Sequence, residues 1–299
     1  MISKYEGLSV VLPVVKTEHL HSCLESIVKA VPKEFESLEV VIVLAAANLR
    51  LDLENYTKLE INVLDLPNAK YGEAIAFGVE NCRNELIALM NDDDLIRSNR
   101  FSRQVMAFDQ FDIDIAITDF KKFGNRKKFL NLNFQPQSVY HYTYLLLGPY
   151  GANATWMFTK TWFNGQVNQI DPTKNFDWIF ALNAFKNSRI YYDSEKLYFY
   201  RQHKKQTTRS LSYRTELYEE TRRILHQEIE AAIEFKVDER VVPLVSFPYL
   251  KCMVTYKDLS LLFRVLRGIW SIEKARSVWL IYQISIRIVL ATLRLLRKG

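Results

Sequence analysis

A chain of 299 residues is long enough for one large domain, or for a domain with an appendage. With 48% hydrophobic and 25% charged residues, its composition excludes a disordered or low-complexity protein. Cys23, Cys82 and Cys252 are widely spaced and match no zinc-binding pattern, so they indicate reduced thiols in a cytosolic protein. The first seven residues lack the apolar segment of a signal peptide.

The net charge of +6 is unevenly distributed along the chain. From Lys257 to the C-terminus there are nine basic and two acidic residues, so the preceding 256 residues are close to neutral. A uniformly basic protein would suggest a nucleic-acid partner. A near-neutral body with a cationic tail indicates instead an anchor, and no nucleic acid is expected as a partner.

In the first hundred residues, continuously apolar segments alternate with amphipathic ones. The pattern predicts strands at residues 8–13 (stopped by Pro13), 38–44, 59–64 and 85–90, and helices at 18–29 and 71–82. Apolar strands that alternate with helices indicate an α/β fold, with a mainly parallel sheet covered by helices. We therefore expect a nucleotide-binding type of α/β half.

After residue 100 the alternation is less regular. The predicted strands are residues 114–119, 154–159, 190–192 and 197–200, the predicted helices are 176–185 and 215–235, and 121–137 is expected to be a loop or ribbon. We expect one domain at residues 1–210 and a helical C-terminal region at residues 211–299.

An acidic segment, Asn91-Asp92-Asp93-Asp94, directly follows the predicted strand 85–90. Adjacent carboxylates repel one another unless a cation lies among them, and Mg²⁺ and Mn²⁺ favour such oxygen ligands. Open α/β sheets also bind their ligands at the C-terminal ends of the strands. The alternative is a solvated acidic turn that caps the next helix, since Asp is a good N-cap residue.

Four features in a fixed order now give the chain a resemblance to the family 2 glycosyltransferases, which have the GT-A fold. They are the strand Ser9-Val10-Val11-Leu12-Pro13, the acidic segment in place of a DXD-type motif, Asp177 beside Trp178, and Tyr200-Arg201-Gln202-His203. The resemblance covers roughly residues 7–210. It implies a metal-dependent, inverting enzyme that moves a sugar from a nucleotide-diphosphate sugar to a hydroxyl of a glycan or lipid-linked saccharide in surface polysaccharide synthesis.

The resemblance also implies roles for the acidic segment. Asp93 is the expected ligand of a Mn²⁺ or Mg²⁺ cofactor, with His203 as a second ligand or as a donor to the diphosphate. Asp92 and Asp94 are expected near the ribose or holding metal-bound water. Asn91 replaces the commoner first Asp of the motif, and keeps a hydrogen-bond acceptor without its charge.

Two further residues complete the implied chemistry. Asp177 is the expected general base, which removes the proton of the acceptor hydroxyl as that hydroxyl attacks. Its alternative role is that of a helix N-cap. Arg201 is expected to pair with phosphate oxygens. The basic residues around His203 could instead belong to an ordinary solvated loop.

The chain departs from the family after its second strand, where an acidic turn usually helps to read the nucleotide base. Here the apolar segment 44–48 takes that place, so recognition of uracil is less certain, although UDP remains the favoured carrier. Base contacts are expected instead from backbone atoms near Pro13 and Val15 and from Asn68, Lys70 and Gly72.

The basic tail predicts a helix that lies on a membrane. On a helix of 3.6 residues per turn, Arg276, Gln283, Arg287 and Arg294 form one polar stripe on an otherwise apolar cylinder. The apolar run is too short to span a bilayer. Such helices lie in the interface, with arginines at anionic headgroups, so we expect a peripheral protein on the cytoplasmic face of the cell membrane. Packing on a partner subunit is the alternative.

The sequence leaves two other functions to be considered. The altered base-reading turn fits a catalytically silent sugar-nucleotide-binding or scaffold subunit of a polysaccharide assembly complex. A nucleotidyltransferase is disfavoured because no glycine-rich phosphate loop follows the first strand.

Overall fold

The structure is a computed structural model that describes residues 3–33, 35, 37–124, 153–167 and 188–203, together with Phe176, Phe180 and Ala184. All of them belong to one of the two units into which the chain divides, formed by residues 1–135 and 151–207. Asp177, the predicted helix 215–235 and the basic tail lie outside the described residues. The predicted domain boundary at residue 210 therefore stays a prediction.

An eight-stranded sheet forms the centre of this unit, in the order β3-β2-β1-β4-β7-β6-β8-β5. Its strands are β1 (Leu8–Val14), β2 (Leu38–Leu44), β3 (Leu59–Asp65), β4 (Leu86–Leu89), β5 (Leu95–Ile96), β6 (Ile115–Gly124), β7 (Trp156–Thr159) and β8 (Ile190–Gln202). The helices are α1 (Leu20–Val28), α2 (Tyr71–Glu80), α3 (Arg100–Gln110), the 3-10 turn η1 (Asn153–Thr155) and α5 (Lys160–Val167).

Most of the sheet is parallel. β3, β2, β1 and β4 are neighbours that run in one direction, and β6 pairs with β8 in parallel. β7 is antiparallel to β4 and β6, and β5 is antiparallel to β8. This confirms the expected α/β class with a mainly parallel sheet.

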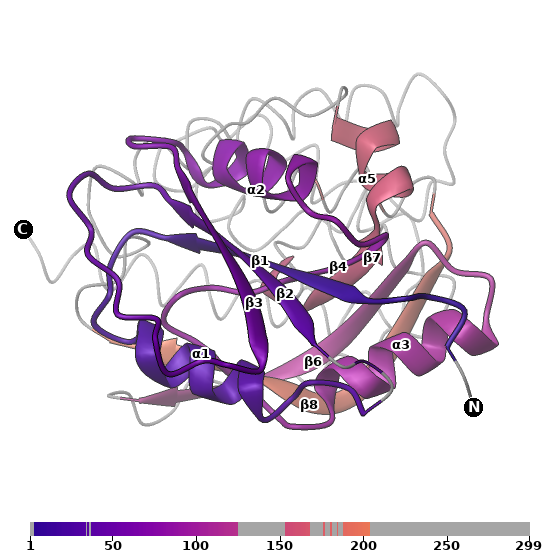
Figure 1. The fold of residues 1–299 in the computed structure, drawn as a ribbon. Helices are drawn as coiled ribbons and strands as arrows, with labels where there is room; N and C mark the ends of the chain where they lie inside the picture. Colours follow the sequence, from indigo (N-terminus) through magenta and orange to yellow (C-terminus); the bar gives the residue numbers. More distant parts are fainter. Residues whose placement is uncertain are drawn as a thin grey trace, which may run out of the picture. The chain divides into compact units, whose positions relative to one another are not determined.

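Helices cover both faces of the sheet, with α2 on one face and α1 and α3 on the other (Figure 1). β1 and β2 are buried along their whole length because alternate side chains face opposite layers. Val10 and Leu12 belong to the core that α1 and α3 cover. Val11 faces α2, where a Cβ atom added to Gly78 would lie 2.5 Å from its Cγ1. Only glycine allows α2 to pack this closely.

The prediction that Pro13 stops the first strand is wrong by one residue, because β1 continues to Val14. Ala45 N donates to Val14 O at 2.9 Å, so Val14 faces β2. Pro13 faces the opposite side, where the pairing of β1 with β4 has already ended at Val11. Its missing N–H therefore breaks no ladder hydrogen bond.

The second half of the sheet differs more from the sequence pattern. Residues 121–137 were expected to be a loop or ribbon, and the first four of them, residues 121–124, extend β6 and pair with the end of β8. The two short strands predicted at 190–192 and 197–200 form one strand, and the pairing register shifts between them. Helices α3 and α5 were not predicted. Among the described residues, none of the helices is both long and apolar enough to span a bilayer.

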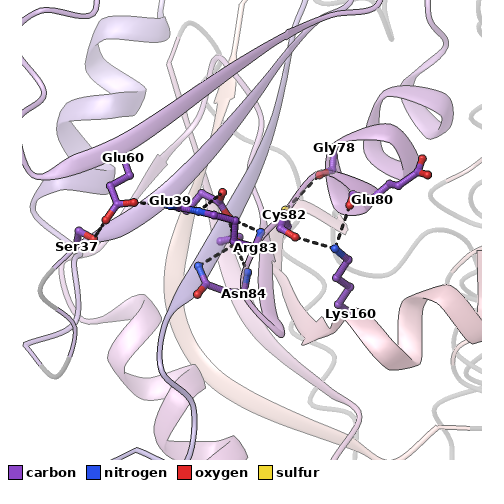
Figure 2. A network of polar contacts seen from close by, with 10 residues as sticks. Ser37, Glu39, Glu60, Gly78, Glu80, Cys82, Arg83, Asn84 and Lys160 are labelled. Atoms are coloured by element: carbon purple, nitrogen blue, oxygen red, sulfur yellow. Dashed lines mark hydrogen bonds and ion pairs between the residues drawn. The ribbon is translucent and has the colours of Figure 1, made fainter.

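A network of ion pairs and hydrogen bonds lies where the parallel strands begin (Figure 2). Glu39, at the start of β2, is buried and accepts hydrogen bonds from Ser9 Oγ and from Arg83 N and Nε, at 2.8 and 3.0 Å for the two Arg83 atoms. Arg83 also pairs with Glu60 of β3. Lys160 donates from Nζ to the carbonyl of Glu80, the last residue of α2, and to that of Cys82 just beyond it. These contacts link the starts of β1, β2 and β3 to the residues that follow α2.

Candidate active site

The acidic segment lies at the C-terminal edge of the sheet, as predicted. Asn91 to Asp94 follow β4 and form a turn before β5. β1, the parallel neighbour of β4, ends at the same edge with Val14. Helix α3 does not begin until Arg100, so the alternative in which these carboxylates cap the next helix is wrong.

Asp92 holds the loop that follows β1. Its Oδ2 atom accepts hydrogen bonds from Val15 N at 2.9 Å and Lys16 N at 3.1 Å. The residue is 9% exposed, and burial raises the pKa of its carboxyl group to about 6 although both amides act to lower it. In this arrangement Asp92 orders protein backbone beside the site.

Asp94 is fully buried and accepts three hydrogen bonds. Tyr198 OH donates to Oδ2 at 2.6 Å, Arg201 N to Oδ1 at 2.6 Å, and Asn91 Nδ2 to Oδ2 at 3.1 Å. Burial, followed by the charge of Asp93, raises the pKa of Asp94 to about 7. Asp94 thus joins the acidic turn to the end of β8 and is not solvated.

Asp93 points away from these contacts and toward His203. His203 Nε2 lies 2.9 Å from Asp93 Oδ2, and the two side chains are 17% and 24% exposed. Among the described residues of the acidic turn, Asp93 is therefore the carboxylate that a ligand can reach. Its backbone carbonyl accepts a hydrogen bond from Arg201 Nε at 2.6 Å, which fixes the turn.

Arg201 contacts protein groups on several sides. Besides Asp93 O, it donates from Nη2 to Ser22 Oγ of α1 at 3.3 Å, and its guanidinium lies 4.6 Å from the ring centroid of Phe123. The sequence predicted a contact with phosphate oxygens. The structure places Arg201 at the site, where this residue of β8 contacts both α1 and the acidic turn.

The pair formed by Asp93 and His203 fits the expected divalent cation. His203 Nε2 and Asp93 Oδ2 are at hydrogen-bonding distance, and imidazole nitrogens and carboxylate oxygens are both groups that would hold such an ion. Within the described ranges, no group of three His, Cys, Asp or Glu side chains is close enough to hold a metal. Mg²⁺-type sites commonly use one or two protein ligands together with substrate phosphate, so two fit this chemistry.

Sequence reasoning missed two tyrosines that orient the acidic segment. Tyr71, the first residue of α2, donates from its OH to Asn91 Oδ1 at 3.0 Å. Asn91 in turn donates from Nδ2 to Asp94 Oδ2. Tyr198 lies two residues before Tyr200 in β8 and is fully buried, as is its neighbour Leu197. Asn91 thus serves as a bridge from α2 to β8.

Arg100 and His19 were also missed. Arg100 is fully buried below the turn and donates from Nη2 to Leu89 O at 3.2 Å and to Ala154 O at 2.8 Å. It thereby holds the last residue of β4, and burial lowers the pKa of its guanidinium to about 10. The His19 ring packs edge-to-face on His203 with centroids 5.3 Å apart. Burial, then Arg201, lowers the pKa of His19. No sequence motif marks either residue.

The residues expected to contact the base lie around the same edge. Pro13 is buried and the Val15 amide is bonded to Asp92, whereas Asn68 and Lys70 are exposed. Asn68 has a positive φ of 67° and donates from its amide to Ala45 O at 3.0 Å. Their contact with a base stays a prediction.

Gly72 connects this edge with the segment that leads to Asp177. A Cβ atom on Gly72 would lie 2.6 Å from the Phe176 ring, and Phe176 also packs on Tyr71 with ring centroids 6.4 Å apart. Phe176 immediately precedes Asp177 in the chain. Phe176, which precedes the expected base Asp177, therefore packs against the start of α2.

Comparisons with known proteins agree with this fold. The model of the family described as glycosyl transferase family 2 matches residues 9–221. The crystal structure of S. aureus TarS 1–349 aligns with a TM-score of 0.59 at 18% identity, over 88% of this chain and 79% of that chain. The same TarS fragment in complex with UDP-GlcNAc gives 0.58 at 17%, over 89% and 82%.

A longer TarS structure aligns with a TM-score of 0.59 at 16% identity, over 91% of this chain and 50% of that chain. At such identities the likeness concerns the fold alone, and it confirms the expected fold class. No curated protein matches the chain.

Proposed function

The chain belongs to glycosyl transferase family 2, and from that premise we propose that it moves a sugar from a nucleotide-diphosphate sugar to a saccharide hydroxyl with inversion. The observation that carries this proposal is that the three aspartates of the acidic turn have different contacts. Asp92 and Asp94 are engaged with protein donors, whereas Asp93 faces His203 at the ligand-binding edge of the sheet.

Asp93 and His203 would hold a Mn²⁺ or Mg²⁺ ion that pairs with the donor's diphosphate. When bound, this ion offsets the negative charge that the diphosphate acquires as the glycosidic bond breaks. The protein's own contribution is orientation. Arg201 fixes the Asp93 backbone, and the contacts of Asp94 hold the turn against β8.

Asp177 would act as the general base that removes the proton of the attacking hydroxyl. The contact of Phe176 with Gly72 and Tyr71 supports this role, because it keeps the preceding residue beside the helix that orients Asn91. Attack on the face opposite the leaving diphosphate would invert the anomeric centre.

UDP is the favoured carrier, since TarS, which shares the fold, is known in complex with UDP-GlcNAc. The proposed acceptor is a glycan or lipid-linked saccharide of a surface polysaccharide. A lipid-linked acceptor agrees with the basic, amphipathic pattern of the tail from Lys257, which would bring the protein to the cytoplasmic face of the membrane.

The test combines two variants and one measurement of binding. Whole protein is heated with a panel of nucleotide-sugars and Mn²⁺, and turnover is followed as release of nucleoside diphosphate. A donor at 100 times its Kd stabilises a protein by about 2.7 kcal/mol. We expect Asp93→Ala to lose both this stabilisation and turnover. We expect Asp177→Asn to keep the stabilisation while turnover falls about 10²–10⁴-fold.

Glu54→Gln is the matched control, because Glu54 is an exposed carboxylate on the loop between β2 and β3. It should behave like the wild type in both measurements. Wild-type turnover and Mn²⁺-dependent donor binding in Asp93→Ala would remove the acidic turn from the mechanism.

A catalytically silent donor-binding subunit is the second candidate. One observation favours it: Ala45, in the turn after β2, has no polar side chain, and its amide and carbonyl already bond Val14 and Asn68. Donor binding without turnover, unchanged by Asp177→Asn, would support this alternative.

A further inference from the structure

His19 faces the proposed cation site without a structural task of its own. It is the N-cap residue of α1, yet its side chain makes no capping hydrogen bond. Within the part of the chain that the structure describes, its ring contact is the edge-to-face packing on His203, at an interplanar angle of 74°. Its charge also interacts with that of Asp93. The side chain is partly exposed and can turn.

The spacing of the two imidazoles matches that of rings bound to one ion. Metal–nitrogen bonds of about 2.1 Å place the centroids of two imidazoles on a common ion roughly 5 Å apart. The observed centroid separation of His19 and His203 is 5.3 Å. His203 Nε2 in turn lies 2.9 Å from Asp93 Oδ2. Asp93 and His203 are thus adjacent, and the His19 ring lies beside His203 in an edge-to-face orientation.

We propose that His19 is a third protein ligand of the cation, and that it turns from its edge-to-face contact to join Asp93 and His203 when the ion binds. The inference rests on the proposed function, because it assumes the cation site at Asp93. It goes beyond that function by adding a ligand. The turn is needed because no three such side chains in the described segments are already grouped for a metal.

One carboxylate and two imidazoles make a softer ligand set than carboxylates alone. Imidazole favours later transition metals, and Mg²⁺ favours oxygen ligands and retained water. His19 therefore raises the affinity of the site for Co²⁺ relative to Mg²⁺. A chain with a non-ligating residue at position 19 would lose this preference.

The experiment measures metal binding without donor. Metal-free whole protein is titrated with Co²⁺, followed by its visible absorption, and with Mg²⁺, followed by calorimetry. We expect His19→Ala to weaken Co²⁺ binding at least about tenfold, the lower end of the losses seen when metal-site contacts are removed, with little change for Mg²⁺. His19→Asp, whose carboxylate both ligates and caps a helix, should restore binding and shift the preference toward Mg²⁺.

His21→Ala is the matched control, because His21 lies on the same helix but bonds Tyr56 and Glu25 and has a 71% exposed side chain. Its Co²⁺ affinity should equal that of the wild type. Unchanged Co²⁺ affinity in His19→Ala, with binding lost in Asp93→Ala, would overturn this inference and leave the proposed function standing. Unchanged affinity in Asp93→Ala as well would overturn the proposed cation site itself.

Discussion

Asp92, Asp93 and Asp94 are neighbours in the chain but differ in what they contact. Asp92 binds the backbone after β1, Asp94 binds Tyr198 and the backbone of Arg201, and Asp93 faces His203. Each carboxylate is distinguished by its donors and not by its own chemistry. The conformation of this turn therefore decides which aspartate is available to a cation.

Tyr198→Phe tests the bond that holds Asp94. Losing a hydrogen bond to an ionised group costs about 1.5–3 kcal/mol, and losing one to a neutral group about 1 kcal/mol. The pKa of Asp94 is raised to about 7, so its folded-state carboxyl is ionised at pH 8 and protonated at pH 5. The larger loss in free energy of unfolding should appear at pH 8, measured by urea denaturation at both values.

The direction of this pH dependence follows from the linkage between proton binding and folding. Tyr198 donates to Asp94 and lowers its pKa, so the variant raises that pKa further, and the folded protein releases its proton at a higher pH than before. Equal losses at pH 5 and pH 8 would contradict an ionised Asp94 in the wild-type fold.

The sequence located the acidic turn but could not assign its three side chains. The partners of Asp93 and Asp94, which are Tyr198, Arg201 and His203, lie about a hundred residues later, and the pairing of β8 with β5 and β6 brings them near. His19 and Tyr71 belong to no sequence motif, because their contacts with His203, Asn91 and Phe176 depend on tertiary packing.

At the scale of elements, α2 connects the acidic turn with the chain near Asp177. Its first residues, Tyr71 and Gly72, contact Asn91 on one side and Phe176 on the other. Glycine at position 72 is required by this close approach and not by an unusual backbone angle.

Gly72→Ala should therefore displace Phe176, since the new Cβ atom would lie 2.6 Å from its ring. Overpacking of this kind costs about 1–3 kcal/mol. We expect a lower melting temperature together with a lower kcat, because the displaced residue precedes the proposed base. Nucleoside diphosphate release and thermal melting measure the two effects.

Gly165→Ala provides the matched substitution. Gly165 lies in α5, where an added Cβ atom would meet nothing within 4 Å. Alanine in a helix is favoured over glycine by up to about 1 kcal/mol, so this variant should be slightly stabilised and fully active. A Gly72→Ala protein as stable and active as Gly165→Ala would argue against the packing role of Gly72.

The first half of the sheet was predictable because β1 and β2 are buried on both faces and read as continuous apolar runs. The second half was not. Lys121 and Lys122 are exposed and polar, and they belong to β6 only because β8 supplies their hydrogen bonds. Lys121 pairs with Phe199 and Lys122 with Tyr200, so no neighbouring residue in the chain signals that these lysines belong to a strand.

For the whole molecule, the two edges of the sheet differ in chemistry. At the edge where the strands start, Arg83 pairs with both Glu39 and Glu60 (Figure 2). At the opposite edge, Asp93 and His203 remain partly exposed. The ion-pair network and the proposed ligand-binding site thus lie at opposite ends of the same strands.

The basic tail leads to a prediction about where the protein is found in the cell. Removing the residues after Tyr256 deletes nine basic residues and the amphipathic segment. We expect the shortened protein to move from the membrane fraction to the soluble fraction, because interfacial helices bind through buried apolar area and attraction to anionic lipid. Sedimentation with anionic vesicles measures this. Pelleting that persists would place the anchor elsewhere.

The pairing of β8 with β6 and β5 has a consequence for how this protein folds during translation. Residues 91–94 emerge from the ribosome long before Tyr198, Arg201 and His203, which complete their surroundings. A nascent or prematurely terminated chain that stops before β8 leaves Asp94 without two of its donors and Asp93 without its imidazole. Such a fragment cannot form the contact between Asp93 and His203, so translation must pass residue 203 before the surroundings of the acidic turn are complete.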